Sequence, residues 1–449
     1  MVEPVYTCKF GGSSLATGER VARVAELIKS DPRRRYVVVS APGKAPQRQT
    51  KVTDLLYAVH ENKRLGLDYQ TANKEALRPF EEIAYHLDEI LGGLGLVEVE
   101  YENVLRAHTQ LLQEQEVSRD FLASRGEYLM ARLLAIYLGW PFVDAEDIVR
   151  FTSQGVFDSE LTHRLMSEAL AKYPKAVIPG FYGSTPEGYI KTFSRGGSDL
   201  TGAIVARATN SVLYENWTDV DGMMSADPRI VPDAKPISQV TYRELRELSY
   251  MGASVFHEEA VTPARLGEVP IQIRNTFNTE ALGTVIMHES QRIAHPVVVG
   301  VAGHKGFCTI NLRKMGMNEE RGFLRRFLSV LEDEGLNVEH VPGGIDTLSV
   351  IVPSEQVHTC ETHLEQEIRL YCHPDEVVID HGLALIATVG HGMKDTVGVA
   401  ARLTGALARD GVNIKMLNQG ASELSIIVGV VEDDYERAIR AIHQEFFSA

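Results

Sequence analysis

The apolar positions of the first forty residues predict a strand, a helix and a second strand. Val5 to Phe10 is a short extended run that Gly11-Gly12 interrupts. Apolar residues then recur at helical spacing, at Val21, Val24 and Ile28. Tyr36 to Ser40 is a continuous apolar run, typical of a strand buried on both faces. This order of elements implies a parallel sheet with helices on its faces.

Similar elements continue to about residue 290. Ser13 or Ser14 is the expected cap of the first helix. Residues 55–140 are rich in Glu, Leu and Ala and predict mostly helix. The remaining predicted elements are strands at 176–178, 212–217, 271–274 and 284–287, a glycine turn at 194–199, and helices at 200–208 and from Thr241. We expect an α/β domain over residues 1–290, with a mainly parallel sheet sandwiched by helices.

The rest of the chain contains an internal repeat. Gly322 and Gly398 lie 76 residues apart. The same offset, without a gap, pairs Arg326 with Arg402, Leu331 with Leu407, Gly335 with Gly411, Asn337 with Asn413, Gly344 with Gly420, and Leu348-Ser349 with Leu424-Ser425. Each copy predicts a helix that ends at a left-handed glycine and leads into strands. The alternative is a coincidence between two amphipathic helices, which this many matches disfavours.

Composition narrows the class of protein. The chain has 449 residues, 44% hydrophobic and 24% charged, as in soluble globular proteins. The net charge of −16 argues against nucleic acid or an anionic membrane as partner. Four cysteines are too few for a disulfide framework. The N-terminus does not read as a secretory signal, and no run approaches the ~20 apolar residues of a membrane span. We therefore expect a cytoplasmic protein.

Two glycine turns could hold phosphate. Lys9 stands at the end of a strand, before Gly11, Gly12 and a helix, where backbone N–H groups and a lysine charge can meet an anion. Taken alone, this pattern favours a plain tight turn beside a surface lysine. The second turn, Ser194 to Asp199, offers the Arg195 guanidinium, the N–H groups of Gly196 and Gly197, the Ser198 hydroxyl and the Asp199 carboxylate.

Two further segments carry candidate groups. Thr218, Asp219 and Arg229 lie in a turn-rich segment after a strand and could contact a nucleotide, although an acidic surface loop is the plainer alternative. Glu127, in Ser124-Arg-Gly-Glu127, could bind an ammonium group. The alternative is a glutamate in the first turn of a helix, favoured by the helix dipole.

Several signatures are absent. The chain has no G-x-x-x-x-G-K-[ST] loop, no G-x-G-x-x-G fingerprint, no H-E-x-x-H motif and no protein-kinase signature. Cys360, His363, Cys372 and His373 are close in sequence, but their spacing fits no usual zinc pattern. We predict no metal site.

Taken together, the motifs resemble those of the aspartate kinases. KFGGSS, VVVSAPG, KVTDLL, SRGE, SRGGSD, WTDVDG with ADPR, and GASVFH occur in the family's order. The repeat looks like a pair of amino-acid-sensing ACT domains. The resemblance implies an amino-acid kinase fold at 1–290 followed by two α+β βαββαβ units, the first at 312–380 and the second at 297–311 with 381–449.

The resemblance implies transfer of the ATP γ-phosphoryl group to the β-carboxylate of L-aspartate, the first step of lysine, threonine and methionine biosynthesis. Lys9, Asp199 and Arg195 would be catalytic, with Asp199 orienting Lys9. ATP would be bound by Lys9, Phe10, Gly11, Gly12, Ser13, Thr218, Asp219, Met224, Arg229, Ser254 and Val255. Aspartate would be bound by Ser40, Thr53, Glu127, Arg195, Gly196, Gly197 and Ser198, with Arg195 on the α-carboxylate and Glu127 on the α-amino group.

The resemblance also implies regulation and assembly. Lysine, or else threonine, would bind the first ACT unit at Met315, Met317, Glu320, Gly322, Asp346 and Thr347. A homo-oligomer would form through the ACT units, and Mg²⁺ would arrive with ATP. Two departures from the family are Ser254, where many relatives have lysine, and a long Lys44–Lys51 segment. A glutamate kinase and a catalytically inactive amino-acid-sensing regulator remain as alternatives.

Overall fold

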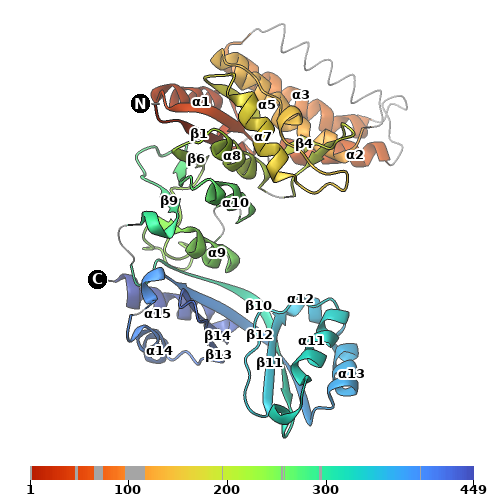
Figure 1. Ribbon diagram of the computed structural model, residues 1–449, viewed down its shortest axis with the longest axis vertical. Coiled ribbons are helices and arrows are strands. Elements are labelled where there is room, and N and C mark those ends of the chain that lie inside the picture. Colours follow the sequence, from red (N-terminus) through yellow and green to blue (C-terminus); the bar gives the residue numbers. More distant parts are fainter. Residues whose placement is uncertain are drawn as a thin grey trace. The chain divides into compact units, whose positions relative to one another are not determined.

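The structure, a computed structural model, describes residues 3–45, 49–64, 74–96, 117–194, 196–253, 256, 258–292, 296–394 and 396–448 (Figure 1). It divides into two compact units. The first comprises residues 1–223, 238–242 and 255–292, and the second comprises residues 224–237, 243–254 and 293–449. None of the described helices is both long enough and apolar enough to cross a membrane.

The first unit is built on a seven-stranded sheet in the order β3-β2-β1-β6-β8-β9-β7. Its strands are β1 (Tyr6–Phe10), β2 (Arg34–Val39), β3 (Ala176–Pro179), β6 (Leu213–Thr218), β7 (Gln239–Thr241), β8 (Ile271–Asn275) and β9 (Thr284–Met287). The first five strands of that order are mutually parallel, and β9 runs antiparallel to β8. The predicted mainly parallel sheet is therefore confirmed. A short hairpin of β4 (Tyr182–Ser184) and β5 (Ile190–Thr192) is separate from this sheet.

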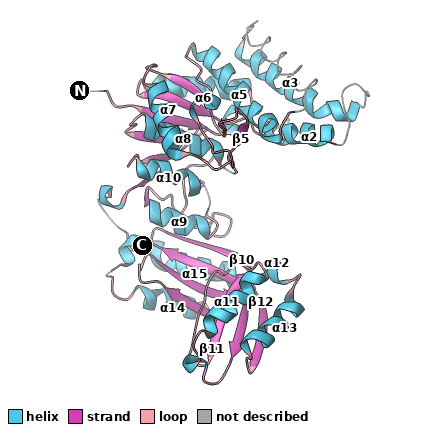
Figure 2. Cartoon of the chain, turned by 45° about the vertical axis from the view of Figure 1, so that its right-hand side comes forward, coloured by secondary structure: helices cyan, strands magenta, loops and turns pink. Residues whose placement is uncertain are grey.

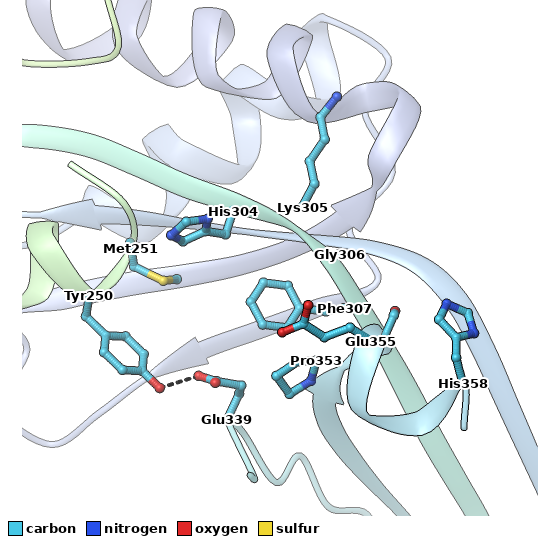
Figure 3. A pocket seen from close by; sticks show the side chains of 11 residues that line it. Tyr250, Met251, His304, Lys305, Gly306, Phe307, Glu339, Pro353, Glu355 and His358 are labelled. Atoms are coloured by element: carbon cyan, nitrogen blue, oxygen red, sulfur yellow. Dashed lines mark hydrogen bonds between the residues drawn. The ribbon is translucent and has the colours of Figure 1, made fainter. Parts of the chain in front are cut away.

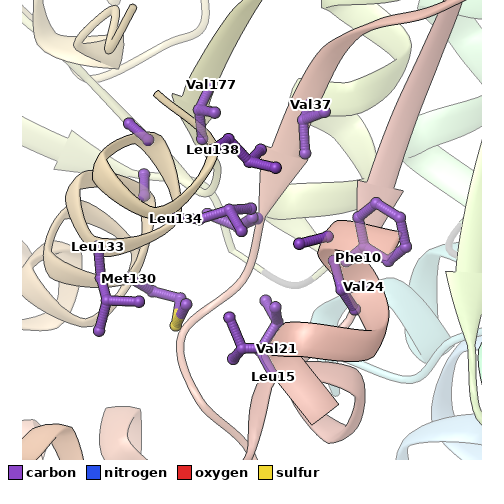
Figure 4. Close-up of a cluster of buried hydrophobic side chains, with 14 of the residues drawn as sticks. Phe10, Leu15, Val21, Val24, Val37, Met130, Leu133, Leu134, Leu138 and Val177 are labelled. Carbon is purple, nitrogen blue, oxygen red and sulfur yellow. The ribbon is translucent and has the colours of Figure 1, made fainter. Parts of the chain in front are cut away.

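Some helices of the first unit lie directly on the sheet, and others pack on those helices. They are α1 (Gly18–Ser30), α2 (Val52–Arg64), α3 (Lys74–Leu94), α5 (Arg119–Leu138), α6 (Ala145–Ile148), α7 (Ser159–Leu170), α8 (Gly197–Ala208) and α10 (Glu258–Leu266). Apolar residues of α1 and α5 meet β1, β2 and β3 in one core, where Val24, Leu134 and Val177 are fully buried (Figure 4). Helix α8 packs on β1, β2 and β6. The continuous apolar strands thus bury their side chains under helices, as their pattern indicated.

The start of α1 differs from the prediction. Gly12–Leu15 forms a single 3₁₀ turn, η1, and α1 begins only at Gly18. Thr17, not Ser13 or Ser14, caps α1, because its side chain accepts a hydrogen bond from the Arg20 N–H at 3.3 Å. Ser14 is instead buried, with its hydroxyl 2.7 Å from that of Thr276.

The second unit contains a five-stranded antiparallel sheet in the order β11-β10-β12-β14-β13 (Figure 2). Its strands are β10 (Gly300–Arg313), β11 (Thr347–Pro353), β12 (Glu376–Val389), β13 (Met416–Gln419) and β14 (Ser425–Val431). Its helices are α9 (Tyr242–Tyr250), α11 (Phe323–Asp333), α12 (Ser354–Val357), α13 (Glu361–Cys372), α14 (Val399–Arg409) and α15 (Tyr435–Phe447). Strands β10 and β12 run through two hydrophobic cores, one under α11 and α13 and one under α14 and α15.

The internal repeat is visible in the backbone. Helices α11 and α14 begin and end at positions that are 76 residues apart. Gly335 and Gly411 follow these helices with φ of 70° and 66°, the left-handed conformation that the sequence predicted. Gly322 and Gly398 stand before the helices, also with positive φ.

Candidate functional site

Several of the predicted kinase residues lie at the carboxyl ends of the parallel strands. Lys9 and Phe10 end β1, Ser40 follows β2, and Thr218 ends β6. In open α/β sheets ligands bind outside this edge, because loops and helix starts converge there. The candidate site therefore lies where the fold class places one.

Lys9 is held in a buried ion pair. Its side chain is only 9% exposed, and its Nζ lies 2.6 Å from Oδ1 of Asp199, in the first turn of α8. The amide of Asn216 donates to the same carboxylate oxygen at 2.7 Å. Asn216 lies beside Lys9 in the register of β1 and β6. Two strands thus fix one carboxylate and one ammonium group at the sheet edge.

Asn216 was not singled out from the sequence. It is buried within β6, next to another buried polar residue, Glu215. Two adjacent polar side chains in a strand covered on both faces are costly to bury unless each has a partner. These two adjacent polar residues in a buried strand were the feature of the sequence that could have identified Asn216. Glu215 finds its partner away from the site, in a buried ion pair of 2.6 Å with Arg34.

The first glycine turn is shaped by close backbone approach. A Cβ on Gly12 would lie 2.7 Å from the Ala41 carbonyl oxygen, and the Gly43 N–H donates to the Gly12 carbonyl at 2.8 Å. A Cβ on Gly11 would stand 3.5 Å from the Lys9 Nζ. Glycine thus packs the turn against the loop after β2 and keeps the backbone beside the Lys9 ammonium open. Phe10 is fully buried and stacks on Trp217, so only its main chain can contact a ligand.

Glu127 is buried within α5 rather than at its start. The helix begins at Arg119 after the Ser118 cap, so Glu127 is not the first-turn glutamate of the plainer interpretation. The adjacent Gly126 explains how it reaches the sheet edge. A Cβ on Gly126 would lie 2.7 Å from the Ala41 Cβ, so only glycine lets α5 approach the loop after β2 this closely.

The surroundings of Glu127 favour its neutral form. Its side chain is buried, and burial raises the pKa to about 8, although the Ala41 N–H and the charge of Lys9 oppose the shift. Its Oε2 is buried and has no hydrogen-bond partner. A buried acceptor without a partner is costly, so this oxygen is suited to a donor supplied by a ligand.

The second glycine turn begins α8. Gly196, with φ of 61°, is its N-cap, and Gly197 and Ser198 form its first turn beside Asp199. Ser198 is buried, and it leaves no room for a Cβ on Gly180, at the end of β3. No side chain caps this helix start, and uncapped N–H groups at a helix N-terminus suit an anion. Arg195 lies outside the described residues.

The other proposed contacts are spread more widely. Thr53 lies in the first turn of α2, and Ser13 lies in η1. The Thr218 hydroxyl donates to Asp219 at 3.2 Å on an exposed turn. Ser254 and Val255 lie outside the described residues. Within the segment of 44–51, residues 46–48 do so too, and Lys44 and Lys51 are exposed.

Met224 and Arg229 belong to the second unit. Met224 packs against the core under α14 and α15. The Arg229 guanidinium pairs with Asp227 at 2.6 Å, and this pairing lowers the pKa of Asp227. Their assignment to the nucleotide stays a prediction.

The candidate effector residues gather in one corner of the first ACT-like copy. The Gly316 N–H donates to Asp346 at 2.9 Å, which ties the turn after β10 to the turn before β11. Glu320 pairs with Lys314 and with Arg326, and the Lys314 bond is the main cause of its lowered pKa. Gly322 caps α11 and Thr347 begins β11.

The two methionines of the effector set lie in opposite settings. Met315 is 85% exposed, whereas Met317 is packed in the core. Met317 therefore supports the turn and offers no free surface to a ligand.

Comparison with known proteins agrees with this arrangement. The amino acid kinase family model matches residues 6–275, and an ACT domain model matches residues 386–446. Aspartokinase 3 of Bacillus subtilis is 40% identical over 98% of both chains.

Solved structures give the same result. The aspartate kinase of Clostridium acetobutylicum, described as an allosteric enzyme, has a TM-score of 0.93 and 40% identity, over 98% of this chain and all of that one. The Escherichia coli aspartokinase III in complex with aspartate and ADP has a TM-score of 0.75 and 25% identity, over 99% of this chain and all of that one. Family models, whole-length identity and fold therefore agree that this chain belongs to the amino acid kinase family and, within it, to the aspartokinases.

Proposed function

We propose that this aspartokinase transfers the γ-phosphoryl group of ATP to the β-carboxylate of L-aspartate at the carboxyl edge of the first unit's sheet. The observation that carries the proposal is the buried Lys9–Asp199 pair, with Asn216 fixing the carboxylate and glycine turns on both sides. The complex of the Escherichia coli relative with aspartate and ADP supports the choice of ligands.

The reaction needs positioning and charge stabilisation more than acid–base chemistry. A carboxylate is already a nucleophile, so no general base is required, and charge builds up on the transferring phosphoryl oxygens. Lys9, oriented by Asp199, would stabilise that charge. The N–H groups of η1 and of the start of α8 would hold phosphate oxygens.

Aspartate recognition would use groups from three elements. Glu127 would accept from the α-ammonium group, because its Oε2 is buried without a partner. Arg195 would bind the α-carboxylate. Ser40, Thr53 and Ser198 would line the same pocket.

We infer that Mg²⁺ is carried by the nucleotide. Asp199 is the one carboxylate that forms an ion pair with Lys9 among the described residues. A single carboxylate leaves most of the Mg²⁺ coordination sphere to phosphate oxygens and water, as this cation prefers. When bound, the cation would neutralise charge on the phosphates.

The second unit would carry regulation. Residues 312–380 would form the first ACT unit, and 297–311 with 381–449 the second, after a catalytic domain of 1–290. Lysine, or else threonine, would bind between the turn at Met315–Gly322 and the turn at Asp346–Thr347. Its ammonium group would compete with Lys314 for Glu320 and with the Gly316 N–H for Asp346. Assembly into a homo-oligomer through these units would link effector binding to the kinase site.

The activity is tested by trapping the product. The purified protein is incubated with Mg-ATP, L-aspartate and hydroxylamine, and aspartyl hydroxamate is measured. We expect product from the parent and a loss of roughly a hundredfold or more in Lys9→Ala, with Lys29→Ala as a matched surface control. Product with L-glutamate in place of aspartate would refute the substrate assignment. No product with either amino acid would refute the kinase function.

The effector is tested in the same assay. Lysine and threonine are titrated separately and together against the parent and Asp346→Asn. We expect lysine to inhibit the parent, and the variant to need roughly tenfold more lysine for half inhibition. No inhibition by either amino acid would contradict the proposed regulation.

A further inference from the structure

Two histidines and a glutamate meet on the surface of the second unit. His358 follows α12, Glu361 begins α13, and His381 lies on β12. One ligand atom from each side chain lies within 4.8 Å of the other two. Within the described ranges, this is the one place where three imidazole, thiolate or carboxylate groups come so close together.

The contacts within the cluster are specific. The His381 Nε2 lies 3.1 Å from Glu361 Oε2. The rings of His358 and His381 stack, with centroids 4.9 Å apart and planes at 11°. Residues 23 positions apart in sequence therefore place two imidazole rings against each other, beside one carboxylate.

We propose that His358, Glu361 and His381 form a binding site for a divalent transition-metal ion such as Zn²⁺ or Co²⁺. Two imidazole nitrogens and one carboxylate oxygen are a ligand set that suits Zn²⁺, Co²⁺ and Ni²⁺. Mg²⁺ prefers an all-oxygen sphere and does not fit this set. Ligands about 2.0 Å from a tetrahedral zinc lie roughly 3.3 Å apart. The three ligand atoms, within 4.8 Å of one another, must therefore move closer to bind the ion, and the partial exposure of all three side chains leaves them free to rotate.

One member of the cluster, His358, also lines a neighbouring cavity, whereas Glu361 and His381 do not. His358 lies on the edge of a cavity of about 550 Å³ that Glu355, Glu339 and His304 also line (Figure 3). Water or a small anion in this cavity could complete the coordination. Three protein ligands and an open position are the arrangement of an accessible metal site rather than of a closed structural one.

The four cysteines and histidines that lie close together in the sequence, at 360, 363, 372 and 373, do not form such a site. Cys372 is buried in the core under α13, and His363 pairs with Glu334 at 2.8 Å. Cys360 donates to the Gln356 carbonyl, and His373 follows the end of α13. These four side chains do not gather. His363 supplies a matched control, since it is an exposed histidine on α13 that pairs with a glutamate, Glu334 at the end of α11, without a second imidazole beside it.

The position of the site suggests what the metal would do. His381 lies at the end of the segment of β12 that pairs with the outer half of β10, just before β12 begins to pair with β14 at Leu383. A bound ion would tie the corner between α12 and α13 to this point of the sheet. We expect it to stiffen the boundary between the two repeat copies.

Metal binding by the full-length, tag-free and nucleotide-free protein tests the proposal. Zn²⁺ is titrated by calorimetry and Co²⁺ by visible absorption, on the parent, His358→Asn, His381→Asn and the control His363→Asn. We expect one Zn²⁺ site in the parent and the control, and roughly tenfold or greater weakening in each of the other two. The Co²⁺ complex should show no thiolate charge-transfer band. Zn²⁺ should raise the melting temperature of the parent and the control only.

Three results would overturn the proposal. The first is the absence of any Zn²⁺ site in the parent with a Kd below about 100 µM. The second is unchanged binding in His358→Asn and His381→Asn, and the third is a Co²⁺–thiolate band. Because both variants change exposed side chains, loss of folding is not expected, and circular dichroism would verify it. A simple ion pair between His381 and Glu361 would give the first of these results.

Discussion

The state of Glu127 leads to a prediction about how substrate affinity depends on pH. Its pKa of about 8 means that roughly one molecule in ten carries the carboxylate at pH 7, and one in a hundred at pH 6. If the ammonium group of aspartate binds the carboxylate, the apparent affinity is reduced by that fraction. We therefore expect KM for aspartate to fall about tenfold per pH unit from 6 to 7 and to level off above 8. Each pH unit corresponds to about 1.4 kcal/mol of binding.

Steady-state ADP release at pH 6 to 9, with saturating Mg-ATP, measures this slope. Glu127→Gln should bind aspartate weakly and lose the slope, because its amide does not titrate. Glu146→Gln is the matched control, since Glu146 also has a raised pKa through burial but is not proposed to touch substrate. A flat KM in the parent, or a slope retained by Glu127→Gln, would refute the reasoning.

Three further predictions concern the same site. Asn216→Ala should lower kcat by roughly tenfold with little change in KM for aspartate, since Asp199 loses the donor that orients it. A rise in KM as large as the fall in kcat would contradict a positioning role. Gly126→Ala should lower stability by about 1–3 kcal/mol and raise KM for aspartate, because its Cβ has no room, whereas Gly92→Ala, with open space around it, should be neutral or stabilising in thermal unfolding. Between pH 4.5 and 8 the folded parent holds a Glu127 proton that the unfolded chain has lost. Its free energy of unfolding should therefore fall by a few kcal/mol, relative to that of Glu127→Gln, as the pH rises through this range. Denaturant titrations at pH 5 and 8 that show no such difference would contradict the buried, protonated state of Glu127.

Local pattern was enough to predict much of the fold. The buried strands of the first unit have continuous apolar runs, and the 76-residue repeat located α11 and α14 with their glycines. Elements without a strong hydrophobic periodicity were harder to predict. Strand β7 has only three residues, and the β4–β5 hairpin has three in each strand, so tertiary pairing rather than pattern determines them.

In the candidate site, too, local pattern indicated some features, and tertiary structure determined the others. Glycine turns and the order of motifs indicated Lys9 and Asp199, and the resemblance implied that Asp199 orients Lys9, but no local pattern showed the contact itself. That contact depends on β1 and α8, which are far apart in sequence and are brought together by the sheet. The depth of Glu127 within α5 could not be predicted either. Its position depends on where the helix begins and on the space that Gly126 leaves for Ala41.

The long strands of the second unit also determine when its parts can fold during synthesis. Gly300–His304 at the start of β10 pairs with residues 385–389 of β12, about 85 residues later in the chain. At about 5–20 residues per second, the ribosome delivers this partner some 4–17 s after the first segment. Throughout that interval an apolar strand stays without its neighbour and can pair with another nascent chain. The nested order of the strands therefore means that the second repeat copy can complete its sheet only after the whole of the first copy has been synthesised.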